Sequence, residues 1–146
     1  MKPTLSLALA FTLLASAAWS GQTAPVIDVY KSPTCGCCSK WIDHLKSNGF
    51  TVRSHDTRDV VQHKIRLGVP QGYDSCHTAE VGGYVIEGHV PAKDIKRLLK
   101  EKPAARGLTV PGMPIGSPGM EQGSHKDVYD VILLGRDGRP QVYSRY

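Results

Sequence analysis

The chain has 146 residues, which is enough for one domain with a hydrophobic core. Its 18 lysines and arginines outnumber its 13 aspartates and glutamates, so the formal net charge is +5 at pH 7. The basic residues are dispersed and form no single stripe, and we therefore exclude nucleic acid as a partner.

The first 20 residues have the pattern of an export signal. One lysine is followed by an apolar run from Leu5 to Ala18 and then by small residues that end at Ser20. The apolar run is shorter than the roughly 18 residues that a membrane-spanning helix needs. We expect residues 1–20 to be a signal peptide that is cleaved after Ser20. The mature chain, residues 21–146, is then one domain without membrane insertion, and in a bacterium its location is the periplasm.

Strands and helices alternate in the first half of the mature chain. The residues of Pro25–Ser32 and Phe50–Asp56 predict two strands, the first of them buried. A helix between these strands is stopped by Asn48 and Gly49, and a second helix is predicted over Thr57–Gly68. The apolar residues of the first helix recur at helical spacing and are Cys38, Trp41, Ile42 and Leu45.

The second half of the chain continues the alternation and then becomes irregular. A third strand with a turn is predicted over Gly82–Val90, and a helix over Pro91–Lys102 has proline at its first position. Residues 128–146 predict a closing β-hairpin with its turn at Asp137 and Gly138. Between them, Pro103–Lys126 is dense in glycine and proline and too long for an idle connector in a small domain.

Three of the four cysteines open the first predicted helix, and Cys76 lies far along the chain. Free backbone N–H groups and the positive end of the helix dipole stabilise a thiolate, which predicts a pKa for Cys35 below the free value of about 8.5. The spacing of Cys35 and Cys38 places them one helical turn apart, within reach of a disulfide or a shared metal. The pattern alone leaves a redox pair, a disulfide staple and a metal site open.

The order of elements resembles that of thioredoxins and glutaredoxins, including a strand, turn and last helix in YVIEGHVPAKDIKRLL. The resemblance implies a thioredoxin-like α/β fold, with a mixed β-sheet flanked by helices, a long Gly/Pro-rich loop and a C-terminal β-hairpin. In that superfamily a loop ending in a cis-proline lies against the cysteine site. This chain has YDSCHTAEVGG at that point, so the resemblance places Cys76 and His77 opposite Cys35 and removes the proline.

Four motifs, CGCC, SCHTA, YVIEGHVP and VPGMPIGSPGME, resemble the CopG-type copper-resistance proteins, a family of small exported bacterial proteins formerly of unknown function. The resemblance implies a periplasmic copper-binding protein, with copper ions and other periplasmic copper-handling proteins as partners. Its implied copper donors are Cys35, Cys37, Cys38 and Cys76. The match to GMPIGSPGM also favours the loop thioethers of Met113 and Met120 as ligands or neighbours of the metal, with Met113 preferred. His77 is a further candidate ligand because it adjoins Cys76.

The chemistry of the residues supports this interpretation. Cu(I) is a soft ion that prefers thiolate and thioether donors. Adjacent residues on a helix diverge by about 100°, so Cys37 and Cys38 are awkward ligands for one ion and better placed to bridge neighbouring ions. We therefore expect a small polynuclear copper site, which is also able to change charge and to act in redox chemistry.

Three alternatives stay open at this point. The first is zinc in a closed four-cysteine site. The second is an enzyme, either a thiol-disulfide oxidoreductase or a copper-dependent redox catalyst. The third is an inert disulfide-stapled domain, although pairing within one helical turn closes almost no loop. The remaining histidines, scattered over separate elements, are expected to be exposed: His44 on the outer face of the first helix, His55, His63, His89 and His125.

Overall fold

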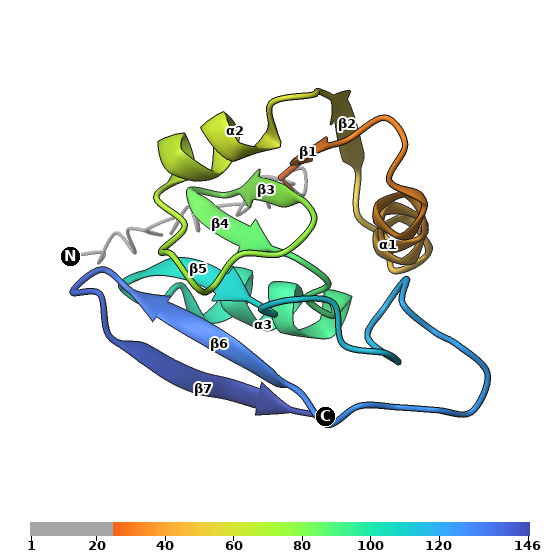
Figure 1. Cartoon of the computed structure of the whole chain (residues 1–146). Helices are drawn as coiled ribbons and strands as arrows, with labels where there is room; N and C mark the ends of the chain where they lie inside the picture. Colours follow the sequence, from red (N-terminus) through yellow and green to blue (C-terminus); the bar gives the residue numbers. More distant parts are fainter. Residues whose placement is uncertain (1–24) are drawn as a thin grey trace, which may run out of the picture.

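The computed structural model describes residues 25–146, so the predicted signal peptide lies outside the described residues. Strands and helices alternate from β1 to α2 as the sequence predicts, and two strands that it does not predict follow later (Figure 1). The elements are β1 (Ile27–Lys31), α1 (Gly36–Ser47), β2 (Val52–Asp56), α2 (Val60–Leu67), β3 (Thr78–Val81), β4 (Tyr84–Glu87), α3 (Ala92–Glu101), β5 (Ala105–Thr109), β6 (Asp130–Gly135) and β7 (Pro140–Arg145).

All seven strands form one mixed sheet in the order β2-β1-β3-β4-β5-β6-β7. β1 pairs with β2 in parallel and with β3 antiparallel, and β3 and β4 form a hairpin. β5 then joins β4 in parallel, and the β6–β7 hairpin completes the sheet. This arrangement confirms the predicted α/β fold with the element order of thioredoxins, extended by three strands at one edge.

The main core lies between the sheet and helices α1 and α3. Each buried leucine or isoleucine there contributes about 1.5–3 kcal/mol relative to an exposed one. Helix α2 contributes no buried residue and packs on the other face of the sheet. Ile86 in β4 points into the core, and neighbouring residues of a strand face opposite sides of the sheet. Glu87 therefore faces the other side, where it pairs with Lys64 of α2. The helical core residues are Trp41, Ile42, Leu45, Ile95 and Leu98.

The helix ends follow the predicted signals. Helix α1 ends at Asn48, which is followed by Gly49 with φ +86°. Helix α2 starts after Asp59, whose carboxylate accepts a bond from the Gln62 amide, and stops at the left-handed Gly68. These local features explain why the short helices stop where they do.

Two strands differ from the prediction. The predicted third strand over Gly82–Val90 is the second strand of a hairpin, because β3 precedes it across the turn at Gly82 and Gly83. The predicted loop over Pro103–Lys126 contains β5 near its start, so the irregular segment begins only at Val110. β3 has four residues and β5 has five. Such short runs beside glycine and proline do not show a clear alternating pattern in the sequence.

No helix within residues 25–146 is long and apolar enough to cross a membrane.

Candidate metal centre

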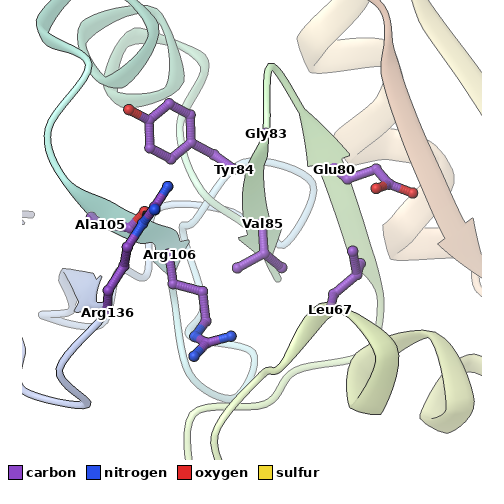
Figure 2. A pocket seen from close by; sticks show the side chains of 8 residues that line it. All are labelled: Leu67, Glu80, Gly83, Tyr84, Val85, Ala105, Arg106 and Arg136. Carbon is purple, nitrogen blue, oxygen red and sulfur yellow. Dashed lines mark hydrogen bonds between the residues drawn. The ribbon is translucent and has the colours of Figure 1, made fainter.

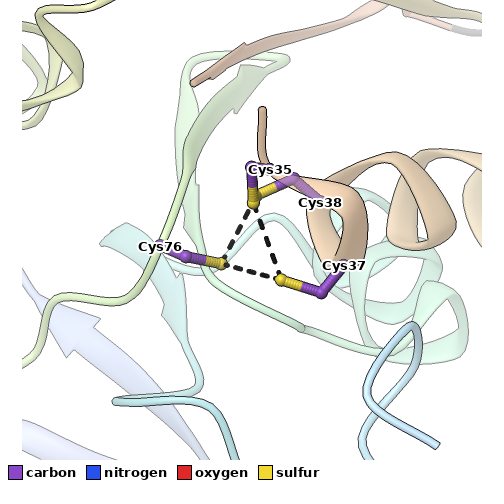
Figure 3. A group of neighbouring side chains, drawn as sticks. All are labelled: Cys35, Cys37, Cys38 and Cys76. Atoms are coloured by element: carbon purple, nitrogen blue, oxygen red, sulfur yellow. Dashed lines mark hydrogen bonds between the residues drawn. A yellow bond between two sulfur atoms is a disulfide. The ribbon is translucent and has the colours of Figure 1, made fainter. Parts of the chain in front are cut away.

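Four cysteine sulfur atoms meet at the start of helix α1 (Figure 3). Cys35 is the N-cap of the helix and forms a disulfide with Cys38, with their Cα atoms 5.4 Å apart. The Cys37 Sγ lies 3.6 Å from the Cys35 Sγ and 4.0 Å from the Cys76 Sγ. The Cys76 Sγ is also 3.5 Å from the Cys38 Sγ. These four residues, here called the sulfur cluster, bring donors from two distant parts of the chain within 4.8 Å of one another.

The helix geometry separates the two adjacent cysteines. Cys38 is fully buried and faces the core, whereas Cys37 is half-buried and lines an open hollow. Their sulfur atoms therefore approach Cys76 from different directions, in accord with the divergence expected for neighbours on a helix.

The loop before β3 holds Cys76 in place through a buried ion pair beneath it. The Ser75 amide donates to Glu87 Oε1 at 2.7 Å, and Lys64 donates to the same carboxylate and, at 3.2 Å, to the His77 carbonyl. The Glu87 side chain is fully buried, and breaking such a pair costs about 3–5 kcal/mol. Lys64 and Glu87 are therefore positioning residues for Cys76.

The same loop differs from that of thioredoxins as predicted. Residues 25–146 contain no cis peptide bond, and the residues that lead into β3 at this point are Cys76 and His77. The structure thus places these two side chains opposite the disulfide, where the resemblance to thioredoxins put them.

Two histidines contact Cys76. His77 is fully buried, its Nδ1 lies 3.3 Å from the Cys76 Sγ, and its ring packs on Trp41 with ring centres 4.4 Å apart. The His89 Nε2 lies 3.1 Å from the same sulfur. The prediction that His89 is exposed is wrong, because its ring is fully buried beside His77.

Within residues 25–146, none of the other four histidines belongs to a group of possible metal donors with a cysteine. Of these, His125 is exposed as predicted, with 67% of its side chain accessible. His44 is half-buried because its Nε2 accepts a hydrogen bond from the Ala92 amide at 3.1 Å. His55 pairs with Asp28, and His63 stacks on Tyr30, so both are also only partly accessible.

Burial favours the uncharged forms of Cys76 and of the two histidines that contact it. Burial and then the neighbouring Cys37 raise the pKa of the Cys76 thiol to about 11. Burial also lowers the pKa of His77 well below its ordinary value, and that of His89 less strongly. A metal ion that binds Cys76 must therefore displace the thiol proton, whereas both imidazoles are already neutral.

The Gly/Pro-rich loop packs against the sulfur cluster. A hollow of about 420 Å³ is lined by Cys37 together with Met113 and Met120, and Met113 is 52% exposed. Gly119 has φ +87°, and a Cβ there would lie 2.8 Å from the Cys37 carbonyl oxygen and from the Trp41 amide nitrogen. Glycine is therefore required for the loop to approach α1 so closely. The structure brings both predicted methionines to the same hollow as Cys37.

A second hollow, of about 360 Å³, lies over β3, β4 and β5 (Figure 2). Its lining contains no cysteine, histidine or methionine, and its charged groups are Glu80, Arg106 and Arg136. The Glu80 carboxylate already accepts bonds from Tyr30 and Arg66 at 2.8 and 2.9 Å. This hollow therefore has no donor set for a soft metal.

The chain is similar to a described protein family and to two solved structures. A family profile described as "Protein of unknown function, DUF411" matches residues 73–120, the segment that contains Cys76, His77, His89 and both loop methionines. The chain is similar to two solved structures, "Copper resistance protein copG" in Form 1 and Form 2, with 48% identity and a TM-score of 0.81 to each. The similarity covers 85% of this chain, 98% of Form 1 and 99% of Form 2. No curated protein matches the chain.

Proposed function

We propose that this chain, which belongs to the CopG family of copper resistance proteins, binds Cu(I) in the periplasm through its sulfur cluster. The observation that supports the proposal most directly is the approach of four cysteine sulfur atoms to within 4.8 Å of one another. In this proposal the protein sequesters copper or passes it to other periplasmic copper-handling proteins.

The donor set suits Cu(I) because thiolates are soft ligands. Sulfur atoms that share one metal at about 2.3 Å lie about 3.7–4.0 Å apart. The separations of 3.6, 4.0 and 3.5 Å between neighbouring sulfur atoms of the cluster are close to that range. Small movements of the side chains are therefore enough to admit metal between them.

The charge of the cluster favours more than one ion. Four thiolates with a single Cu(I) leave a net charge of −3, and partial burial makes such a charge costly. Each further Cu(I) that bridges two thiolates removes one negative charge. We therefore propose a polynuclear site in which Cys37 and Cys38 bridge different ions.

The disulfide sets a condition on this function. Cys35 and Cys38 supply thiolates only after the bond between them takes up two electrons. A dithiol reductant supplies these electrons and becomes a disulfide itself. Reduction therefore converts a chain with two free thiols, Cys37 and Cys76, into one with four.

A thiol-disulfide oxidoreductase is the second candidate function. The observation that favours it is the Cys35–Cys38 disulfide at a helix N-terminus in a sheet with the thioredoxin order. The same four cysteines serve both functions, so copper binding and disulfide exchange compete for them.

Anaerobic Cu(I) titration followed by native mass spectrometry tests the proposal. We expect the reduced protein to take up several Cu(I) ions together, and the disulfide form to bind fewer because two of its four sulfur donors are blocked. Binding of one ion at most by the reduced protein would contradict the polynuclear site. Equal copper counts in both forms would mean that Cys35 and Cys38 are not donors.

The loop methionines give a finer prediction. Met113→Leu and Met120→Leu keep the apolar volume but remove the thioether, so each should weaken Cu(I) binding by about tenfold if its sulfur is a ligand. Competition with a chromogenic Cu(I) chelator measures the change. Val128→Leu, at an exposed position of the same irregular segment, is the control. Unchanged affinity in both methionine variants would limit these residues to packing.

A further inference from the structure

We propose that Cys76, His77 and His89 form a separate site for one divalent ion with affinity for mixed sulfur and imidazole donors, Cu(II) foremost. This site is complete while Cys35 and Cys38 are joined in the disulfide. The choice of copper among such ions rests on the proposed function, but the site itself does not depend on a Cu(I) cluster.

The three donor atoms have separations close to those that a shared ion requires. The Cys76 Sγ lies 3.3 Å from His77 Nδ1 and 3.1 Å from His89 Nε2, and all three atoms lie within 4.8 Å of one another. With metal–sulfur bonds near 2.3 Å and metal–nitrogen bonds near 2.0 Å, a sulfur and a nitrogen on one ion are about 3.2–3.6 Å apart. The Cys76–His77 separation falls within this range and the Cys76–His89 separation lies just below it, so small side-chain movements are enough to place the three atoms around one ion.

His89 has the tautomer that a ligand needs. Its Nδ1 lies 2.8 Å from the Pro118 carbonyl oxygen, which can only accept a hydrogen bond. The proton is therefore on Nδ1, and the Nε2 lone pair faces Cys76. A carbonyl that orients the distal nitrogen in this way is a common partner of metal-binding histidines.

His77 lacks the contacts that normally satisfy a buried imidazole. Within the described part of the chain its Nε2 is buried without a hydrogen-bond partner, and its Nδ1 lies 3.3 Å from the sulfur of Cys76. The Nδ1 atom faces Cys76, so a metal ion there replaces the weak sulfur contact by a bond and leaves the proton on Nε2, while Trp41 holds the ring in position.

The disulfide separates the two donor sets. When Cys35 and Cys38 form the disulfide, the donors that remain beside Cys76 are the imidazoles of His77 and His89. A set of one thiolate and two imidazoles is typical of copper sites. With all cysteines reduced, the same sulfur belongs to a set of four thiolates that prefers Cu(I). Cys76 is also on the wall of a hollow of about 460 Å³ between α2 and the loop that leads from α2 into β3, which gives an ion a route to it.

Co(II) is the probe for this site, because it reports thiolate and tetrahedral coordination and does not oxidise thiols. The protein carrying Cys37→Ser and the intact disulfide has Cys76 as its one free thiol within the described residues. We expect it to bind one Co(II) per chain, to release the Cys76 proton, and to develop a thiolate charge-transfer band with intense visible d–d bands.

Substitutions in this background identify the donors. Cys76→Ser should abolish the charge-transfer band, and His89→Gln should weaken Co(II) binding by about tenfold or more. His125→Gln, at an exposed histidine, is the matched control and should leave binding unchanged. Circular dichroism and thermal melting show whether each variant is folded. Nitrogen couplings in the electron paramagnetic resonance spectrum of the Cu(II)-loaded Cys37→Ser protein identify the imidazoles without altering either histidine.

The outcomes separate this inference from the proposed function. Absence of a Co(II) charge-transfer band, or Cu(II) signals without two coupled imidazole nitrogens, overturns the three-donor site even if the reduced protein binds several Cu(I) ions. Co(II) bound with these signatures supports the site even if the reduced protein fails to assemble a Cu(I) cluster, a result that would count against the proposed function alone.

Discussion

Replacing Cys76 by serine should weaken Cu(I) binding to the reduced protein by about 100-fold or more and lower the number of ions bound. Cys76 is the donor from outside helix α1, and its sulfur lies 4.0 Å from that of Cys37 and 3.5 Å from that of Cys38. A hydroxyl is a hard donor that does not bridge Cu(I) ions, so the remaining three thiolates lose the link between them.

The same titration by native mass spectrometry measures both quantities. Thr51→Ser, at an exposed position ahead of β2, is the control variant and should bind Cu(I) like the wild-type protein. Circular dichroism of each variant verifies that the fold is retained. Wild-type stoichiometry and affinity in Cys76→Ser would show that the sulfur cluster does not act as one shared site.

The metal-free protein should reduce insulin about tenfold or more slowly than a thioredoxin does. In thioredoxins the loop opposite the cysteines binds an extended substrate, whereas here Cys76 and His77 occupy that loop. The Cys76 pKa of about 11 keeps its thiol protonated near neutral pH, so it adds little nucleophilic thiolate. Stoichiometric Cu(I) should suppress the residual activity by binding Cys35.

Turbidity from insulin reduction, followed with and without Cu(I), measures both effects. A thioredoxin assayed at the same concentration and reductant level is the reference. Rapid turnover that Cu(I) leaves unchanged would favour the oxidoreductase over the copper-binding protein, because occupied cysteines cannot attack a disulfide.

Local sequence signals predicted most of the fold. The helix stops at Gly49 and Gly68 and the turn at Gly138 require backbone conformations that glycine adopts readily, so they can be identified without tertiary information. The clustering of Cys35, Cys37 and Cys38 also follows from spacing alone. The proximity of Cys76 to these three residues is predicted only by the resemblance to thioredoxins, because no local sequence pattern links Cys76 to α1.

The sequence pattern predicts only the second strand of the β3–β4 hairpin, and so it does not place His89 beside Cys76. The turn at Gly82 and Gly83 pairs Thr78 with Glu87, and continuing that register places Cys76 opposite His89. Two consecutive glycines between short apolar runs are a recognised hairpin signal, so this contact could have been found from the sequence.

The Lys64–Glu87 pair could not be predicted in the same way. It joins the inner side of α2 to the second strand of the hairpin, and both residues are charged types that are usually exposed. Only the packing of α2 across the sheet determines that they are buried together beneath Cys76. The same is true of Gly119, whose contact with α1 depends on the path of the whole irregular segment.

The position of Trp41 gives the protein an optical reporter of its own. The indole ring packs on His77, and its Nε1 donates to the Val90 carbonyl at 2.9 Å, so its orientation is fixed. The chain has two tryptophans, and the other, Trp19, belongs to the predicted signal peptide. In a processed chain, emission excited at wavelengths that indole absorbs and phenol does not therefore comes from Trp41 alone, in contact with an imidazole beside Cys76. A paramagnetic or redox-active ion at that imidazole quenches such emission, so occupancy is readable from unlabelled protein.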